Sequence, residues 1–216
     1  IRVLESTLNA DKNIRDQATA TLEQAKSQSY GQLLGTLTSL LANQGVSQIA
    51  RHAAAMFVKN MVSGHSRLTN QQAQTRWNQL DNQTREHVKA CLMNALVAKE
   101  PPVRRAVSQC IGKIASVELP ANRWPKLLQD LCSACMNPQE TLRETALETL
   151  GYICEEVNAE ALGANLNNVL SVIVGNVTQQ TNSATTHKAA LGALQMMLPM
   201  LGHIFRSPTP NDRDYF

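Results

Sequence analysis

Cys132 and Cys135 form a Cys-x-x-Cys pair, the spacing in this sequence that most resembles a metal-binding or redox motif. Two thiolates at this spacing can supply half of a zinc or redox site. A structural zinc ion takes four ligands, however, and no second cysteine pair or nearby histidine follows. Both cysteines lie on the apolar stripe of a predicted helix. We therefore interpret the pair as part of a hydrophobic core.

Catalytic motifs are missing elsewhere in the sequence. The five histidines are dispersed, and none has a carboxylate at a spacing typical of a proton relay. No His-Glu-x-x-His helix, Gly-x-Ser-x-Gly elbow or glycine-rich phosphate loop is present. Asn82-Gln-Thr and Asn176-Val-Thr match the glycosylation sequon, but both lie in helical patterns. The sequence predicts a protein that is not an enzyme and that has no cofactor and no metal.

Composition limits the remaining classes of function. The 216 residues are 43% hydrophobic and 17% charged, which is typical of a folded chain. The net charge is +3 and the basic residues are scattered, so we expect no nucleic-acid partner. No apolar run approaches the roughly 18 residues of a membrane span, and no signal peptide is present. With an odd number of cysteines, the sequence predicts an intracellular protein with reduced thiols.

Apolar residues recur at steps of three and four along nearly the whole chain, as amphipathic helices require. Breakers such as Asn43-Gln-Gly45, Pro101-Pro102 and Asn137-Pro138 divide this pattern at short intervals. Helices of about 12 to 20 residues joined by tight turns are therefore expected. Because the chain begins at Ile1 without methionine and ends at Phe216 within an unfinished segment, we also expect it to be a piece of a longer protein.

One pattern recurs: a basic residue, a small apolar residue three positions later and an aliphatic residue four positions after that. Each copy is counted from the residue before the basic one. The copies start at residues 14, 50, 103, 142 and 186, so they lie 36, 53, 39 and 44 residues apart. HEAT and armadillo repeats span about 40 to 47 residues. The basic residues of the five copies are Arg15, Arg51, Arg104, Arg143 and, in the weakest, His187.

We therefore predict an all-α, armadillo-like solenoid, a right-handed superhelix of about five HEAT-repeat hairpins. The small residue of each copy would let neighbouring helices approach closely, so arginine at Ala54 or Ala146 should disrupt its surroundings. Gly112, Gly151 and Gly192 recur near one repeat position and are interpreted as packing glycines. The approximate repeats are residues 1–28, 29–63, 81–119, 120–158 and 159–206, with an insertion at 64–80 and the start of a next repeat at 207–216.

Two tryptophans follow arginines, at Arg76-Trp77 and Arg123-Trp124, each expected near the start of the first helix of a pair. Packing within the hairpin is one interpretation of these residues. A large aromatic beside an arginine can also anchor an interface with a partner. Both interpretations stay open at this point.

Four segments carry a likeness to a known family: Gln48–Asn60, Arg76-Trp77 with Leu80-Asp81, Glu118–Pro125 and Glu148–Cys154. Together they resemble the amino-terminal part of the karyopherin-β (importin-β) family of nuclear transport receptors. The Leu119-Pro-x-Asn-x-Trp-Pro125 motif favours the importin-β branch, and the likeness covers essentially the whole chain in one register. Val97–Arg105 and Gly192–Pro210 follow the family less closely.

This resemblance implies a receptor that moves between cytoplasm and nucleus through the nuclear pore in the nuclear envelope, and that releases cargo when Ran-GTP binds. By resemblance, Lys59 and Asn60 would contact Ran-GTP, with Arg67 as a looser candidate. A cation there suits an acidic GTPase face. The alternative for Lys59 is an ordinary solvated helix charge.

The family also binds the phenylalanine-glycine (FG) repeats of nucleoporins in a groove between outer helices. The matching positions are Leu170, Ser171 and Val174 on one wall and Phe216 on the other. The alternative is that Leu170 and Val174 complete a hairpin core. The importin-α adaptor and cargo would bind later repeats that this chain lacks, and no membrane or nucleic acid is implied. A different karyopherin or a phosphatase-type scaffold would share the same periodicity.

Overall fold

The computed structural model describes residues 1–64 and 66–205, and every regular element within them is helical. The chain divides into two compact units, residues 1–110 and 111–216, and the division falls inside one helix, α7 (Pro101–Glu118). The helices up to this division are α1 (Arg2–Ser6), α2 (Lys12–Gln28), α3 (Tyr30–Ala42), α4 (Gln48–Val62), α5 (Arg67–Asn78), α6 (Asn82–Ala95) and α7 (Pro101–Glu118). Those that follow are α8 (Leu127–Ala134), α9 (Glu140–Glu156), α10 (Ala159–Leu162), the 3₁₀ turn η1 (Gly163–Asn165), α11 (Leu166–Thr178) and α12 (Ala184–Phe205).

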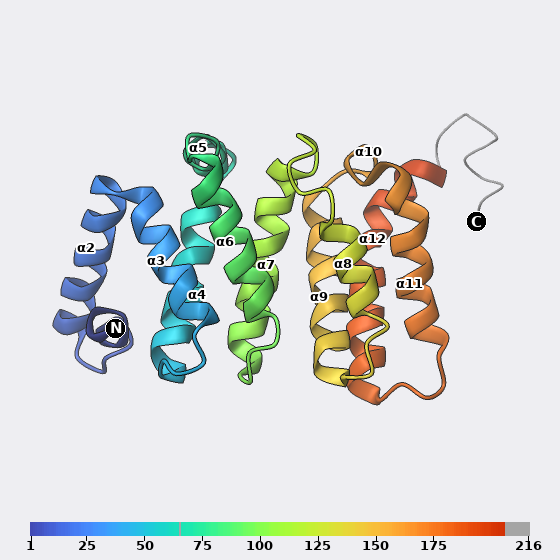
Figure 1. The fold of residues 1–216 in the computed structure, drawn as a ribbon, viewed down its shortest axis with the longest axis horizontal. Helices are drawn as coiled ribbons and strands as arrows, with labels where there is room; N and C mark the ends of the chain where they lie inside the picture. The colour runs from blue at the N-terminus through green and yellow to red at the C-terminus, as the bar shows by residue number, and fades with distance from the viewer. Residues whose placement is uncertain (65, 206–216) are drawn as a thin grey trace. The chain divides into compact units, whose positions relative to one another are not determined.

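Several helices adjacent in sequence pack together as antiparallel hairpins, among them α3 with α4, α8 with α9 and α11 with α12, and the hairpins stack within each unit (Figure 1). In the first unit α3 packs against α2, α4 and α6, and α4 also contacts α1 and α5. In the second unit α9 packs against α8 and α12, while α11 contacts α8 and α12. The predicted all-α fold is confirmed. Helix α5 occupies most of the segment that the sequence assigned to an insertion at 64–80. The division into repeats itself stays a prediction.

Polar side chains set where several helices begin. The carboxylate of Asp11 accepts the backbone N–H of Asn13 at 2.7 Å, and that of Asp81 accepts the N–H of Thr84 at 2.8 Å. Ser66 and Thr69 form a reciprocal capping box at the start of α5. Such caps satisfy N–H groups that have no partner within the helix, and they thereby stabilise its first turn.

The recurring basic residues have a structural role that their spacing did not reveal. In three copies the guanidinium reaches back to the turn before its own helix and donates to a backbone carbonyl. Arg15 donates to Asn9 and Ala10, Arg104 to Ala98 and Lys99, and Arg143 to Asn137. These carbonyls lie in the turn, three or four residues after the end of the preceding helix. Each such arginine therefore ties together the two helices of its own hairpin.

The apolar part of the repeated pattern forms the core, as predicted. The small residue three positions after the basic one is buried in all five copies. The aliphatic residue four positions further on is buried in the first four copies and half-buried at Leu194. The buried members are Ala18, Leu22, Ala54, Val58, Val107, Ile111, Ala146, Leu150 and Ala190.

Two of the three recurring glycines allow close helix packing, and the third does not. A Cβ atom on Gly112 would lie 3.0 Å from the Tyr152 carbonyl oxygen. One on Gly151 would lie 2.9 Å from the Cα atom of Ala193, so α9 and α12 approach backbone to backbone. Nothing lies within 4 Å of the Cβ position of Gly192. The interpretation of Gly192 as a packing glycine is therefore wrong.

Both tryptophans are buried, which confirms packing as their role. Trp124 lies in the turn before α8, close to the expected position. Trp77 lies in the last turn of α5 and not at the start of α6, which corrects the sequence expectation. The error arose because α5 was treated as an insertion. The turn before Trp124 contains Asn122 at φ 51°, a left-handed conformation that asparagine tolerates better than most residues.

Candidate protein-interaction surfaces

The first candidate surface lies at the carboxyl-terminal end of α4 and consists of Met56, Lys59 and Asn60, hereafter the α4 surface. Residues at these spacings share one face of a helix. Met56 and Asn60 are exposed and Lys59 is half-buried. The opposite face of α4 is buried because alanines and Val58 fill it. The helix thus holds three adjacent side chains of different chemistry on a rigid support.

The electrostatic setting of Lys59 is defined by α7. Burial raises the pKa of the Cys110 thiol to about 12, and the nearby ammonium of Lys59 partly opposes this shift. The lysine therefore lies beside an uncharged thiol. It has no carboxylate partner among the described residues. An unpaired, partly desolvated cation is available to an acidic partner.

The second candidate surface consists of Leu170, Ser171 and Val174 on α11, hereafter the α11 surface. Val169, Ile173 and Asn176 form the buried side of this helix. Leu170 is half-buried, Ser171 is exposed and Val174 is 39% exposed. Nothing would meet a Cβ atom added at the adjacent Gly175. The alternative that Val174 completes a hairpin core is therefore wrong in the described structure, whereas for the half-buried Leu170 that alternative stays open.

The side chains of two predicted site residues, Arg67 and Phe216, lie outside the described part of the structure. Arg67 is the first residue of α5, but its side chain lies outside the described part of the structure. Phe216, the predicted second wall of the nucleoporin groove, lies outside the described residues altogether. The structure therefore brings together Lys59 with Asn60, and Leu170 with Ser171 and Val174.

The cysteines give no sign of a metal site in residues 1–64 and 66–205. All five are buried, and no group of three or more metal-ligating side chains is found in this part of the chain. Burial raises the pKa of Cys132, Cys135 and Cys154, and the neighbouring Cys132 thiol raises the latter two further. Such thiols behave as small apolar side chains. The Cys132-x-x-Cys135 pair is core, as predicted.

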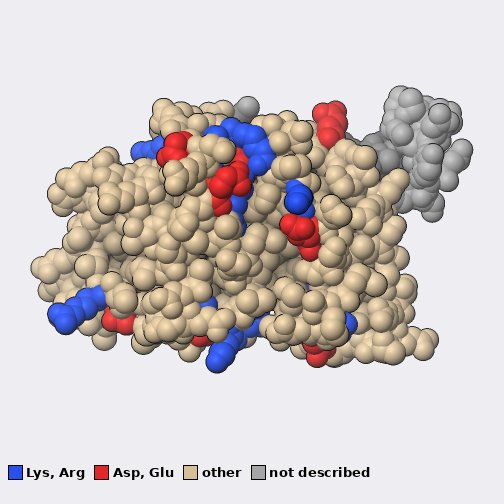
Figure 2. Space-filling model, viewed as in Figure 1, with Lys and Arg blue, Asp and Glu red and all other residues tan. Residues whose placement is uncertain are grey.

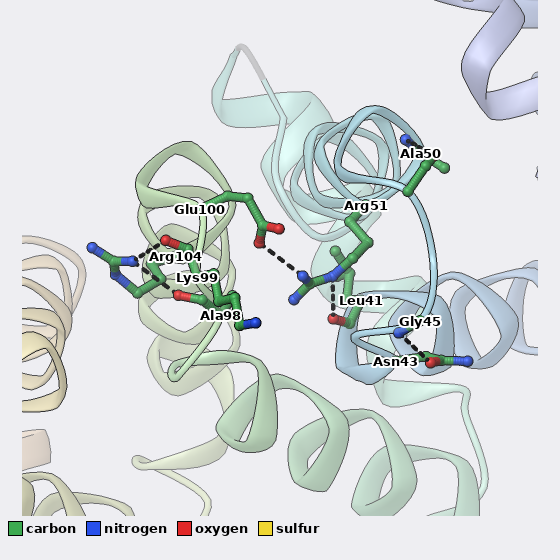
Figure 3. Close-up of polar contacts among 10 residues, drawn as sticks. Leu41, Asn43, Gly45, Ala50, Arg51, Ala98, Lys99, Glu100 and Arg104 are labelled. Atoms are coloured by element: carbon green, nitrogen blue, oxygen red, sulfur yellow. Dashed lines mark hydrogen bonds and ion pairs between the residues drawn. The ribbon is translucent and has the colours of Figure 1, made fainter.

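A buried ion pair in the first unit was missed by the sequence interpretation (Figure 3). Arg51 is only 2% exposed, and its guanidinium lies 2.7 Å from the Glu100 carboxylate. Its Nε atom also donates to the carbonyl of Leu41 at 3.2 Å. Arg51 is the basic residue of the second copy of the pattern, but its ion-pair partner Glu100 lies in the turn before α7. No periodic signal marks Glu100, which lies 49 positions further along the chain.

Charge of both signs is interspersed on the face drawn in Figure 2. Lysines and arginines lie beside aspartates and glutamates there, without a large patch of one sign. This agrees with the charges that are scattered along the sequence. Within the described residues, no helix has both the length and the apolar character needed to cross a bilayer.

Comparison with known proteins shows which family the chain is similar to. Residues 18–98 match the family model "Importin-beta N-terminal domain". Importin subunit beta-1 of Schizosaccharomyces pombe is 30% identical over 205 residues, which are 94% of this chain and 24% of that protein. Importin subunit beta-1 of Arabidopsis thaliana is 30% identical over 215 residues, which are 99% of this chain and 24% of that protein. Over nearly its whole length, the chain is therefore similar to importin-β proteins.

Solved structures of importin-β proteins share the fold. A crystal structure of importin beta superposes with a TM-score of 0.88 at 28% identity and covers 99% of this chain and 25% of that one. A Kap95:Nup1 complex gives a TM-score of 0.86 at 28% identity, with 99% and 25% covered. A structure of Kap95p with RanGDP gives 0.85 at 27% identity, with 99% and 24% covered. These neighbours confirm the predicted HEAT-repeat class. The chain spans about a quarter of the length of the importin-β relatives it matches.

Proposed function

We propose that this chain is the part of a nuclear transport receptor that binds Ran-GTP through the α4 surface and nucleoporin FG repeats through the α11 surface. The observation that carries the proposal is the match to importin-β proteins over nearly the full chain, in sequence and in structure. Two of these structural neighbours are complexes of Kap95 with Nup1 and of Kap95p with RanGDP. The proposal is of a binding protein without catalytic activity of its own.

The Ran part of the proposal rests on the chemistry of α4. Lys59 presents a positive charge with no carboxylate partner in the described chain, and Asn60 beside it can both donate and accept hydrogen bonds. A charge of this kind steers an acidic partner and fixes its orientation. Arg67, whose backbone begins the next helix, is proposed as an additional contact. Importin-α adaptor and cargo would bind parts of the receptor that this chain does not include.

The test is a pull-down of the chain with Ran loaded with a non-hydrolysable GTP analogue and, in parallel, with GDP. Selective capture of the GTP-analogue form is expected. Equal capture of both forms, by a chain shown to be folded by circular dichroism, would contradict the proposal. A phosphatase-type scaffold would show no dependence on the nucleotide. In cells, the full-length receptor is expected in cytoplasm, nucleus and nuclear envelope.

Charge reversal at Lys59 is expected to weaken binding to Ran-GTP by roughly tenfold or more, because it places a carboxylate opposite an acidic face. The measurement is the dissociation constant of Lys59→Glu by titration calorimetry. Lys188→Glu is the matched control, since Lys188 is an exposed lysine on α12, in the second unit. Equal affinities for Lys59→Glu and the unaltered chain would remove this residue from the site.

Truncation of the apolar wall on α11 is expected to weaken capture of nucleoporin repeats. A single phenylalanine ring contacts a shallow slot weakly, and several repeats together make the binding effective. Leu170→Ala should therefore reduce binding of a multi-repeat FG fragment by several-fold or more. Leu191→Ala is the matched control, because Leu191 is a 53% exposed leucine on α12. Capture equal to that of the unaltered chain would place the groove elsewhere.

A further inference from the structure

Three side chains with nucleophilic or basic groups meet between α3 and α6, in the first unit and apart from the α4 surface. The Oγ atom of Ser39 on α3 lies 2.8 Å from the Nε2 atom of His87 on α6. The same Nε2 atom lies 3.6 Å from the Sγ atom of Cys91, one helical turn further along α6. Sequence interpretation missed this cluster. The spacing of His87 and Cys91, four residues apart on one helix, was the signal that could have found it.

The other four thiols of the chain are more deeply buried than Cys91. Cys110 and Cys135 have no exposed surface, and burial raises the pKa of both. Burial also raises the pKa of Cys132 and of Cys154. Cys91 is 8% exposed, the highest value among the five, and it lies beside an exposed imidazole. Reactive thiols are partly accessible and have a base or a cation nearby.

Ser39 completes the arrangement because its hydroxyl has two possible partners. It can donate to His87 Nε2, or it can donate to the carbonyl of Gly35, which lies 2.9 Å away. When Nε2 takes up a proton, the hydroxyl can turn to Gly35 and accept the new N–H. The hydroxyl therefore stabilises His87 both before and after a proton moves from Cys91.

We infer that Cys91 is a site of covalent modification by soft electrophiles of the α,β-unsaturated carbonyl class, with His87 as the proton acceptor. The Cys91 S–H proton passes to Nε2, and the sulfur electron pair forms a bond to the β-carbon of the electrophile. The carbon–carbon π bond breaks, and its electrons move to the α-carbon, which takes a proton from the imidazolium or from water. The net step is addition of the thiol across the double bond, and it needs no oxidant. The inference does not rest on the proposed function.

The test is limited labelling of the folded chain with N-ethylmaleimide, an electrophile of this class, followed by proteolysis and mass spectrometry. Cys91 is expected to be labelled before Cys110, Cys132, Cys135 and Cys154. His87→Gln should slow labelling of Cys91 by roughly tenfold, less than the 10²–10⁴ of evolved catalytic bases, because Nε2 is shared with Ser39. Cys91→Ser should abolish the early labelling.

Two results would overturn the inference. One is labelling of another cysteine in the folded chain at the same rate as Cys91. The other is a His87→Gln chain that labels at Cys91 as fast as the unaltered chain. A His87→Gln chain that had lost its fold would label at all five cysteines, so it is recognised directly. In that case His87→Asn, with a shorter amide, replaces it and the same two outcomes apply.

Discussion

Replacement of Glu100 by alanine is expected to lower the free energy of unfolding of the first unit by about 3–5 kcal/mol. The reason is that the guanidinium of Arg51, 2% exposed, would lose the carboxylate that lies 2.7 Å from it and would remain in the protein interior. The carbonyl of Leu41 would still accept one hydrogen bond from it, but would not neutralise its charge. Urea unfolding followed by circular dichroism measures the loss, and hydrogen exchange in α3 and α4 assigns it to this unit.

Two control variants test the cause of this loss. Lys12 and Asp16 form an ion pair on the exposed face of α2, so Asp16→Ala should change the stability by only about 0.5 kcal/mol or less. The double variant Arg51→Met with Glu100→Leu removes both charges and keeps similar volume, so it should recover much of the loss. A change below about 1 kcal/mol for Glu100→Ala would mean that the pair contributes no more than a surface contact.

Arginine at position 146 is expected to unfold the second unit at ordinary temperature, with a loss above about 4 kcal/mol. Ala146 is fully buried on α9, which packs against α8 and α12. Because Gly151 and Ala193 approach closely, α9 and α12 have no space between them for an arginine side chain. Ala54→Arg should act in the same way on the first unit, because Ala54 is also fully buried.

The matched control for this variant is Glu155→Arg, on an exposed position of the same helix. It introduces the same side chain without burying it, so the change should stay within about 0.5 kcal/mol. If Ala146→Arg had the same melting temperature as the unaltered chain, the assignment of Ala146 to the buried small position of its repeat would be wrong. Because repeat arrays can unfold in parts, the two units need separate probes.

Periodicity predicted most of the fold correctly because helices bury residues at fixed local spacings. The positions of Ala54, Ala146 and Leu150 in the core follow directly from that rule. The same rule located α4 and α11, and resemblance located the two candidate surfaces upon them. A recurring glycine alone was a less reliable guide to packing. Gly112 and Gly192 occupy similar repeat positions, but only a Cβ atom added at Gly112 would meet a neighbouring helix.

Contacts between distant segments could not be predicted from a single sequence. Glu100 pairs with a residue 49 positions away, and His87 meets a serine 48 positions away. Neither separation along the sequence corresponds to a helical turn or to a constant repeat length. The turns between helices differ in length from copy to copy, and α5 adds a helix that interrupts the repeat. Trp77 was misplaced for the same reason, since the polar sequence of α5 did not show the period of a buried helix.

The hydrogen bonds of Arg15 and Arg104 to their own hairpin turns also bear on how such an array can grow. Donor and acceptor lie five or six residues apart, so a single duplicated segment carries both of them. A newly duplicated hairpin would therefore contain this hydrogen bond from the start. The pair formed by Arg51 and Glu100 spans two hairpins, and duplication of either hairpin alone would separate its partners. Bonds within a hairpin can therefore be inherited by copying, whereas each bond between hairpins has to arise by mutation after the copies have met.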